Sequence, residues 1–255
     1  MRGVSASYTV NGSTTAGGAG ASASYTSRTG YAGQLLDVAG LVITASPLTV
    51  NEGGTRQLSA GLLNDDNTTS PLAAGSIAWS VAAGPLSGIS ATGLATAAAV
   101  YQDTTATARG NYQAYTATLN LTVLNTNADN FGSYAGDGIA DDWQVQYFGL
   151  NNPLAGPLQD PDNDGWNNLF EYNACLVPTD PLSVFAFKII DAPGGGHSVA
   201  FTRLPGCTYT LMGSSNLSLW APVTGTITDA GTLRTILDPA GNGGRRFYYI
   251  SVLRN

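Results

Sequence analysis

The chain has 255 residues and a formal net charge of −7, and only 11% of its residues are charged, against about 25% in an average soluble protein. This charge excludes a basic groove for nucleic acid, and there is no run of about 18 apolar residues that could form a transmembrane segment. Hydroxyl-rich, lysine-poor strands can be solvated without charge, so the composition predicts a secreted, all-β protein of two or more units. The start "MRGVSASYTV" lacks the apolar stretch of an export signal. Either the signal is missing from this numbering, or the chain leaves the cell by another route, or it stays inside.

Residues 1–40 are predicted to form a β-hairpin extension. The segment "SASYT" occurs at residues 5–9 and 22–26, and around both copies apolar side chains alternate with Ser and Thr, as in half-buried strands. The glycine-rich "NGSTTAGGAG" separates the two copies. Such a hairpin has too little apolar surface to be stable alone. We therefore expect its strand to complete a sheet edge, either in its own chain or, as we favour, in a neighbouring copy.

Residues 41–126 are predicted to form an antiparallel sandwich, because short strands alternate with Gly, Pro and Asn. The clearest strand is "YTATLNLTV", residues 115–123, in which every second residue is apolar or aromatic. The stretches "ITASPLTVNEGGTRQLSA", "IAWSV", "GISATGLATA" and "YTATLNLTV" together resemble a bacterial immunoglobulin-like domain of cell-surface proteins. The resemblance implies an immunoglobulin-like fold for this part of the chain.

Residues 127–182 are predicted to form a short helix followed by an EF-hand-like calcium-binding linker. In "GIADDWQVQYFG", residues 138–149, Ile139, Trp143 and Tyr147 recur every four residues, which indicates a helix that ends at Gly149. The linker continues with "DPDNDGWNNLFEY", residues 160–172, where three aspartates on alternate residues precede a glycine and then a glutamate.

The order Asp-x-Asp-x-Asp-Gly-x5-Glu in this stretch is the pattern of a calcium loop. Calcium takes six to eight oxygen ligands, and alternate residues of a tight loop aim their side chains at one point. No Lys or Arg is close in sequence to neutralise these carboxylates, which favours a bound cation over a solvated Asx turn. The expected ligands are the side chains of Asp160, Asp162, Asp164, Asn168 and Glu171 and the backbone carbonyl of Trp166.

The stretch "DGIADDWQVQYFG…DPDNDGWNNLFEYNACLVPTDP" resembles the calcium-binding segments of thrombospondin type 3 and dockerin-like repeats, which link domains in extracellular proteins. The resemblance suggests a second, weaker ion site held by Asp137, Asp141 and Asp142. Ser133 and Ala135 stand where this pattern has acids. The alternative is that the three aspartates are solvated residues at the start of the helix.

Residues 183–255 are predicted to form a second β domain, with strands at "VFAFKII", "HSVAFT", "TYTLMGS", "GTLRTIL" and "RRFYYISVL". The pattern "YTLMGSSNLSLWAPV", closed by "RFYYISV", resembles small C-terminal β domains of secreted proteins of environmental bacteria. Cys175 and Cys207 either form one disulfide, as we expect in an exported protein, or remain free thiols. Trp220 either stacks on a sugar ring or packs against the domain. His197, the only histidine, lacks the partners of a zinc site or a catalytic triad.

These patterns favour an extracellular, calcium-stabilised structural or adhesive protein over an enzyme, because no nucleophile, acid pair or redox constellation stands out. One interpretation is a filament subunit whose N-terminal strand completes the sandwich of the next copy, so that the partner is the protein itself. The alternative is an accessory protein that binds surface glycans through Trp220. In both cases we expect Ca²⁺ as the cofactor.

Overall fold

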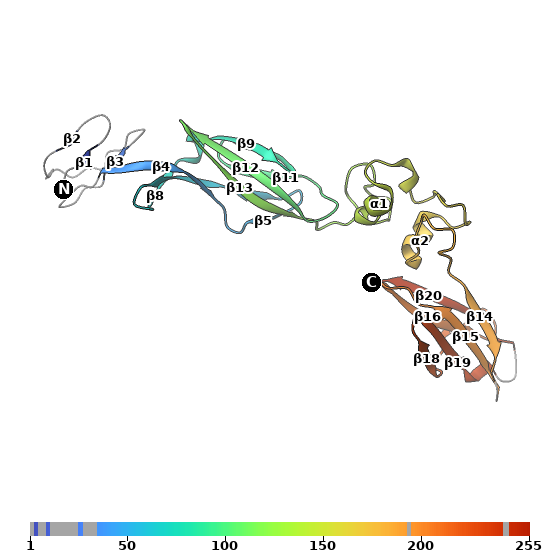
Figure 1. Ribbon diagram of the computed structural model, residues 1–255. Helices are drawn as coiled ribbons and strands as arrows, with labels where there is room; N and C mark the ends of the chain where they lie inside the picture. Colours follow the sequence, from blue (N-terminus) through green and yellow to red (C-terminus); the bar gives the residue numbers. More distant parts are fainter. Residues whose placement is uncertain (1–2, 5–8, 11–24, 28–34, 193–194, 242–244) are drawn as a thin grey trace. The chain divides into compact units, whose positions relative to one another are not determined.

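The chain divides into two compact units, Met1–Ala128 and Asp129–Asn255. The computed structural model describes residues 3–4, 9–10, 25–27, 35–192, 195–241 and 245–255. These residues form several β-sheets and two short α-helices, labelled in Figure 1. The prediction of an all-β protein with a short helical segment is confirmed.

At the start of the first unit, the described residues form two short antiparallel ladders. Strand β1 (Gly3–Val4) pairs with β2 (Thr9–Val10), and β3 (Tyr25–Ser27) pairs with the start of β4 (Leu35–Thr44). Tyr25, which ends the second "SASY", lies opposite Asp37 of β4. Residues 25–27 are therefore paired within their own chain, and so are residues 3–4 with residues 9–10. Val4 and Val10 thus lie on two paired strands, and not on the single strand that the alternation around the first copy predicted. Residues 1–2, 5–8, 11–24 and 28–34 of the expected extension lie outside the described residues.

Three sheets build the rest of the first unit, with strand orders β3-β4-β7-β8, β5-β13-β12-β9 and β10-β11-β6. All pairs are antiparallel except β5 beside β13. The remaining elements of this unit are β5 (Thr49–Asn51), β6 (Thr55–Gln57), β7 (Ser59–Asn64), β8 (Thr69–Leu72), the 3-10 turn η1 (Ala74–Ser76), β9 (Ala78–Ala83), β10 (Leu86–Ile89), β11 (Leu94–Ala97), β12 (Thr104–Tyr112) and β13 (Tyr115–Leu124).

The core of the first unit is shared by strands of all three sheets, as expected for a β-sandwich. Ile43 of β4, Leu86 of β10 and Leu121 of β13 belong to one buried cluster, on which Trp79 of β9 packs. Burying each such aliphatic side chain contributes roughly 1.5–3 kcal/mol. The predicted alternation of residues 115–123 is confirmed, since the apolar positions are buried or half-buried and the others are mostly exposed.

The end of the first unit is fastened by Glu52, one of only two glutamates in the chain. Its carboxylate accepts hydrogen bonds from the backbone N–H groups of Val100, Thr126 and Asn127, at 3.1, 2.7 and 2.6 Å. Hydrogen bonds to an ionised group are among the stronger ones in proteins. Glu52 thus ties the turn after β5 to the residues that follow β13.

The second unit contains the two helices, α1 (Asp141–Phe148) and α2 (Asn168–Ala174), followed by seven strands within the described residues. The strands form two antiparallel sheets of order β14-β15-β19-β18 and β17-β16-β20. The five predicted strands of this region are present. The bounds are η2 (Pro153–Ala155), β14 (Phe187–Asp191), β15 (His197–Thr202), β16 (Cys207–Ser214), β17 (Ala221–Pro222), β18 (Ile227–Ala230), β19 (Leu233–Asp238), η3 (Pro239–Gly241) and β20 (Phe247–Arg254).

One hydrophobic core joins the two sheets of the second unit. Phe201 of β15, Leu211 of β16 and Ile236 of β19 are buried together. The predicted helix is confirmed as α1, and it ends at Gly149 in a backbone conformation with φ of 77°, which favours glycine. No helix among the described residues is long and apolar enough to cross a membrane.

The region expected to be a linker packs with the second β region. Residues from Asp129 onward belong to the same compact unit as β14–β20, and α2 contacts β20 directly. The loop that was predicted to bind calcium lies between α1 and α2 in the sequence and belongs to this same unit.

Candidate metal centre

The loop between α1 and α2 brings three aspartates to one point. One carboxylate oxygen of each of Asp160, Asp162 and Asp164 lies within 4.8 Å of the others. A calcium ion holds its oxygen ligands at about 2.4 Å, so ligands of one ion lie up to about 4.8 Å apart. In the described part of the chain, this is the one group of three or more His, Cys, Asp or Glu side chains arranged in this way.

Each aspartate uses one oxygen to shape the loop and leaves the other without a partner. Asp160 Oδ2 accepts from Gly165 N at 3.1 Å, Asp162 Oδ1 accepts from Asp164 N at 3.2 Å, and Asp164 Oδ1 accepts from Trp166 N at 2.8 Å. The second oxygens, Asp160 Oδ1, Asp162 Oδ2 and Asp164 Oδ2, are buried and accept no hydrogen bond from the described residues. Because a buried oxygen without a partner is destabilising, the loop is built for an added donor or a cation.

Helix α2 contributes Glu171, which is completely buried. Neither of its carboxylate oxygens has a hydrogen-bond partner among the described residues. The pKa of Glu171 is raised to about 8, mainly by burial and in addition by the charges of Asp162, Asp164 and Asp160. Glu171 is therefore near enough to the aspartates for their charges to act on it, but it is not in the group whose ligand oxygens all lie within 4.8 Å of one another.

Asn168, three residues earlier on α2, is also completely buried. Its amide Nδ2 donates to the carbonyl oxygens of Leu154 and Gly156 at 2.7 and 2.8 Å. These two bonds fix the orientation of the amide and leave Oδ1 without a partner. Since residues at i and i+3 share one helix face, Asn168 and Glu171 present their oxygens on the same side of α2.

The electrostatics of the loop are unfavourable without a positive charge. Burial also raises the pKa of Asp162, against the effect of its hydrogen bond from Asp164 N, and the carboxylates of Asp164 and Asp160 add to this. None of the four ion pairs found among the described residues involves a loop carboxylate. Trp166 stacks on Phe170 with ring centroids 4.1 Å apart. Its side chain is engaged in this stack, and its backbone carbonyl is the group expected as a metal ligand.

The residues of the expected weaker site are arranged differently. Both oxygens of Asp137 accept hydrogen bonds, from Ile139 N at 3.0 Å and from Gln144 Nε2 at 2.8 Å. Asp142 is exposed, and its Oδ1 accepts from Trp143 N. The structure does not bring Asp142 together with Asp137.

Asp141 is the buried member of this group. Its Oδ2 accepts from Asn130 N and Phe131 N at 2.7 and 2.8 Å, and its Oδ1 has no partner among the described residues. Burial raises the pKa of Asp141, and the charges of Asp129 and Asp137 act in the same direction, against the two amide bonds. A second ion at these residues remains a prediction.

The sequence analysis missed two residues of the segment 129–144, which contains the expected weaker site. Asp129 accepts from the backbone N–H groups of Gly136, Asp137 and Gly138 at 2.6, 3.2 and 2.9 Å. Gln144 is buried and donates to Asp137 and to the carbonyl of Ala155. The spacing could have indicated Gln144. It holds the twelfth position when Ser133 is counted as the first, just as Glu171 holds the twelfth position when Asp160 is counted as the first.

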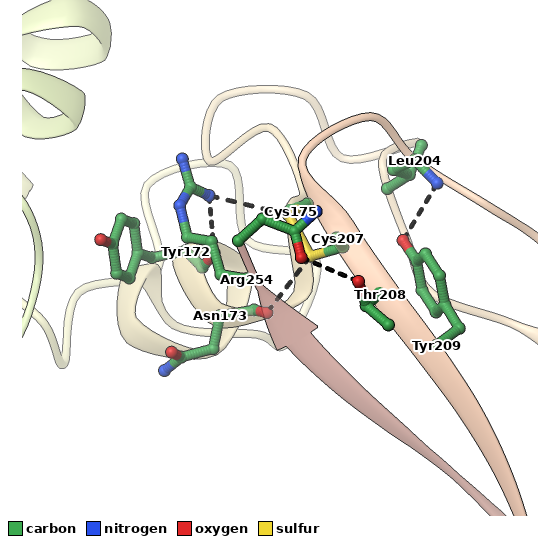
Figure 2. The surroundings of a disulfide bond; sticks show 9 residues. Tyr172, Asn173, Cys175, Leu204, Cys207, Thr208, Tyr209 and Arg254 are labelled. Atoms are coloured by element: carbon green, nitrogen blue, oxygen red, sulfur yellow. Dashed lines mark hydrogen bonds between the residues drawn. A yellow bond between two sulfur atoms is a disulfide. The ribbon is translucent and has the colours of Figure 1, made fainter.

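The end of α2 is fastened to the β-sheets, as Figure 2 shows. Cys175, the residue after the helix, forms a disulfide with Cys207 at the start of β16. Arg254 at the end of β20 donates from Nη1 to the carbonyl of Tyr172 at 2.8 Å, and its guanidinium carbon lies 4.2 Å from the centre of the Tyr172 ring. Sequence analysis allowed the disulfide but missed Arg254, because nothing in one sequence pairs a C-terminal arginine with a helix far upstream.

The other two singled-out side chains lie on the β domain. Trp220 is half-buried, donates from Nε1 to the carbonyl of Leu217 at 3.2 Å, and meets the ring of Tyr249 edge-on at 4.7 Å. His197 lies 3.0 Å from the carboxylate of the exposed Asp191. This pair forms the end of the β14–β15 ladder.

No family model matches the chain, and no curated protein matches it significantly.

Proposed function

We propose that this is an extracellular structural protein whose second unit is stabilised by one calcium ion in the loop of residues 160–171. The observation that carries the proposal is a set of six buried oxygens, on five side chains in the predicted positions, that have no hydrogen-bond partner among the described residues. They are Asp160 Oδ1, Asp162 Oδ2, Asp164 Oδ2, Asn168 Oδ1, Glu171 Oε1 and Glu171 Oε2.

The donor set favours calcium over other ions. All donors are oxygens, which suits hard cations and disfavours zinc or copper. Six side-chain oxygens with the Trp166 carbonyl make seven, within the six to eight that calcium takes. Magnesium demands a strict octahedron and keeps several waters, so a loop that offers this many protein oxygens suits it less.

The ion's proposed role is structural. Helix α2 has only seven residues, and the loop is not flanked by the long paired helices that open in calcium sensors. A disulfide is typical of proteins outside the reducing cytosol. Calcium is abundant outside the cell. An affinity of roughly 0.1–1 mM, or somewhat tighter, would keep such a site occupied there.

Self-association through strand pairing is the proposed assembly. Strand β4 pairs with β7 over residues 38–44 and with β3 over residues 35–37. One edge of β4 between residues 38 and 44 has no strand beside it in the described part of the chain. An open edge of this kind can accept a strand from another copy, which supports an adhesive or filament-forming role.

Glycan binding is the second candidate, and the surface around Trp220 favours it. Leu217, Leu219 and Tyr249 beside Trp220 are 57%, 77% and 42% exposed. Aromatic rings that remain accessible next to apolar side chains can stack on sugar rings. Trp220 and Tyr249 would supply the contact.

Calorimetric titration of calcium into chelator-treated protein tests the main proposal. We expect binding of one ion to the loop in the wild type, none in Glu171→Gln, and unchanged binding in Asp65→Asn, which alters an exposed acid of the first unit. A second ion at Asp137 and Asp141 would add a second binding event. Wild type that binds no calcium, or Glu171→Gln that binds as tightly as wild type, would refute the site.

A further inference from the structure

The C-terminal end of α2 joins the candidate calcium loop to the β-sheets. Glu171, the ligand with two oxygens, lies in the middle of α2, and the next residue, Tyr172, is held by Arg254. Cys175 follows at the end of the helix and is bonded to Cys207. Figure 2 shows that Tyr172, Arg254 and the disulfide form one cluster.

The backbone of this helix end depends on Cys175. Its N–H and that of Leu176 reach back to the carbonyl of Glu171, the latter at 2.8 Å. Cys175 has φ of 59°, the left-handed region, which is unfavourable for a residue other than glycine. Such a conformation persists only where its surroundings enforce it. The bond to Cys207 and the position of Arg254, whose Nη1 lies 3.9 Å from Cys175 Sγ, provide those surroundings.

A seven-residue helix has little stability of its own. The start of α2 is held by Asn168, through its side-chain bonds to Leu154 and Gly156 and its N–H bond to Gln159 O at 2.8 Å. Its end is held by the cluster around Cys175 and by the ring of Tyr172, which packs edge-on against Trp143 of α1. Loss of the cluster would therefore loosen the turn that carries Glu171.

We propose that the Cys175–Cys207 disulfide sets the calcium affinity of the loop, so that thiol–disulfide exchange regulates the site. This inference rests on the proposed calcium binding. A dithiol reductant breaks the S–S bond, transfers two electrons and two protons to give two cysteine thiols, and is itself oxidised to a disulfide. Cys175 can then leave the left-handed conformation, and Glu171 loses its fixed position.

The coupling acts in both directions. If the disulfide favours calcium binding, calcium must favour the disulfide by the same factor. Both cysteines are half-buried, so a small reductant can reach them. Calcium should therefore make the bond harder to reduce at equilibrium, by the same factor by which reduction weakens calcium binding.

The test compares calcium affinity by calorimetry in four proteins. These are the oxidised wild type, the wild type reduced with dithiothreitol, Arg254→Gln with the disulfide intact, and Arg234→Gln. Arg234 donates to Asp229 at 2.9 Å between β18 and β19, so Arg234→Gln removes an arginine contact of the second unit away from α2 and is the control. We expect about tenfold weaker binding after reduction and a several-fold loss in Arg254→Gln, with no change in Arg234→Gln. Far-UV circular dichroism verifies that each protein stays folded.

A second measurement does not depend on any variant. The wild-type protein is equilibrated in mixtures of reduced and oxidised dithiothreitol, with saturating calcium or with chelator, and the reduced fraction of the disulfide is measured by thiol titration. We expect half-reduction in calcium to need an about tenfold higher ratio of reduced to oxidised dithiothreitol. Equal affinities in oxidised and reduced protein, or equal half-reduction ratios, would overturn the regulation and leave the proposed calcium site standing. An oxidised wild type that binds no calcium would overturn both.

Discussion

Replacing Glu171 by Gln should make the calcium-free protein more stable at neutral pH and remove its response to calcium. Without a cation, burial and then Asp162, Asp164 and Asp160 raise the pKa of Glu171 from 4.5 to about 8. Between these values the folded protein keeps a proton on Glu171 that the unfolded chain releases. Because the unfolded state then binds fewer protons, stability falls as pH rises from about 4.5 to about 8.

The size of this effect follows from the shift. One pKa unit corresponds to about 1.36 kcal/mol, so between pH 5 and pH 7 Glu171 alone should lower the unfolding free energy by roughly 3 kcal/mol. Glutamine has the same shape and cannot ionise, so the unfolding free energy of Glu171→Gln should not show this fall between pH 5 and pH 7. For a unit of the length of Asp129–Asn255, a difference of this size is about 10 °C in melting temperature.

Scanning calorimetry in chelator at pH 5 and pH 7 measures the effect, with Asp65→Asn as the control. The melting temperature of the second unit should fall with pH in wild type and in Asp65→Asn, and by about 10 °C less in Glu171→Gln. Calcium at about 100 times its dissociation constant should then stabilise wild type by roughly 2.7 kcal/mol and leave Glu171→Gln unchanged. Parallel pH profiles for wild type and Glu171→Gln would refute the argument that this carboxyl is buried without a partner.

Three further predictions address the rest of the molecule. Glu52→Gln should lower the stability of the first unit by roughly 1–3 kcal/mol in urea unfolding, because it weakens hydrogen bonds to an ionised acceptor. The calcium affinity of this variant should match wild type. An unchanged unfolding midpoint would contradict the role given to Glu52. Deleting residues 1–33 should leave a folded monomer that no longer self-associates in light scattering at high concentration, since the donor strand is gone; unfolding of the deleted protein would instead place that strand in its own domain. Trp220→Ala should abolish retention on insoluble glycans if the protein binds them, whereas Trp79→Phe, a change in the first core, should not; equal retention of both variants and wild type would exclude Trp220 as the contact.

The fold was predictable where side-chain alternation is strong and local. In β13 every second residue is apolar, and a register shift by one residue would turn this whole set toward water, so the pattern admits one arrangement. Helix α1 was predictable from Trp143 and Tyr147, one turn apart on the same face. The sheet order was not predictable, because which strand lies beside β13 depends on contacts between distant residues. The parallel pairing of β5 with β13 is an example.

The grouping of the three aspartates in the candidate site was predictable, whereas the residues that support the site were not. The spacing of Asp160, Asp162 and Asp164 predicts their geometry, because alternate residues of a tight loop point their side-chain oxygens toward one place. The supports come from elsewhere in the chain. The carbonyls of Leu154 and Gly156 that orient Asn168 are backbone groups, which no side-chain pattern reports, and Arg254 reaches Tyr172 across 82 residues.

The two glutamates show why one is structural and the other points to a ligand. Glu52 is surrounded by backbone N–H groups from Val100, Thr126 and Asn127, so its charge is satisfied by the protein itself. Glu171 is more deeply buried, has no hydrogen-bond partner on either oxygen among the described residues, and is close enough to three further carboxylates for their charges to act on it. A chain that uses so few charges would be more stable with an apolar side chain at that position unless something neutralises it. A divalent cation meets that need and also explains the neighbouring unpartnered oxygens of Asp162 and Asn168, which protonation of Glu171 alone would leave as they are.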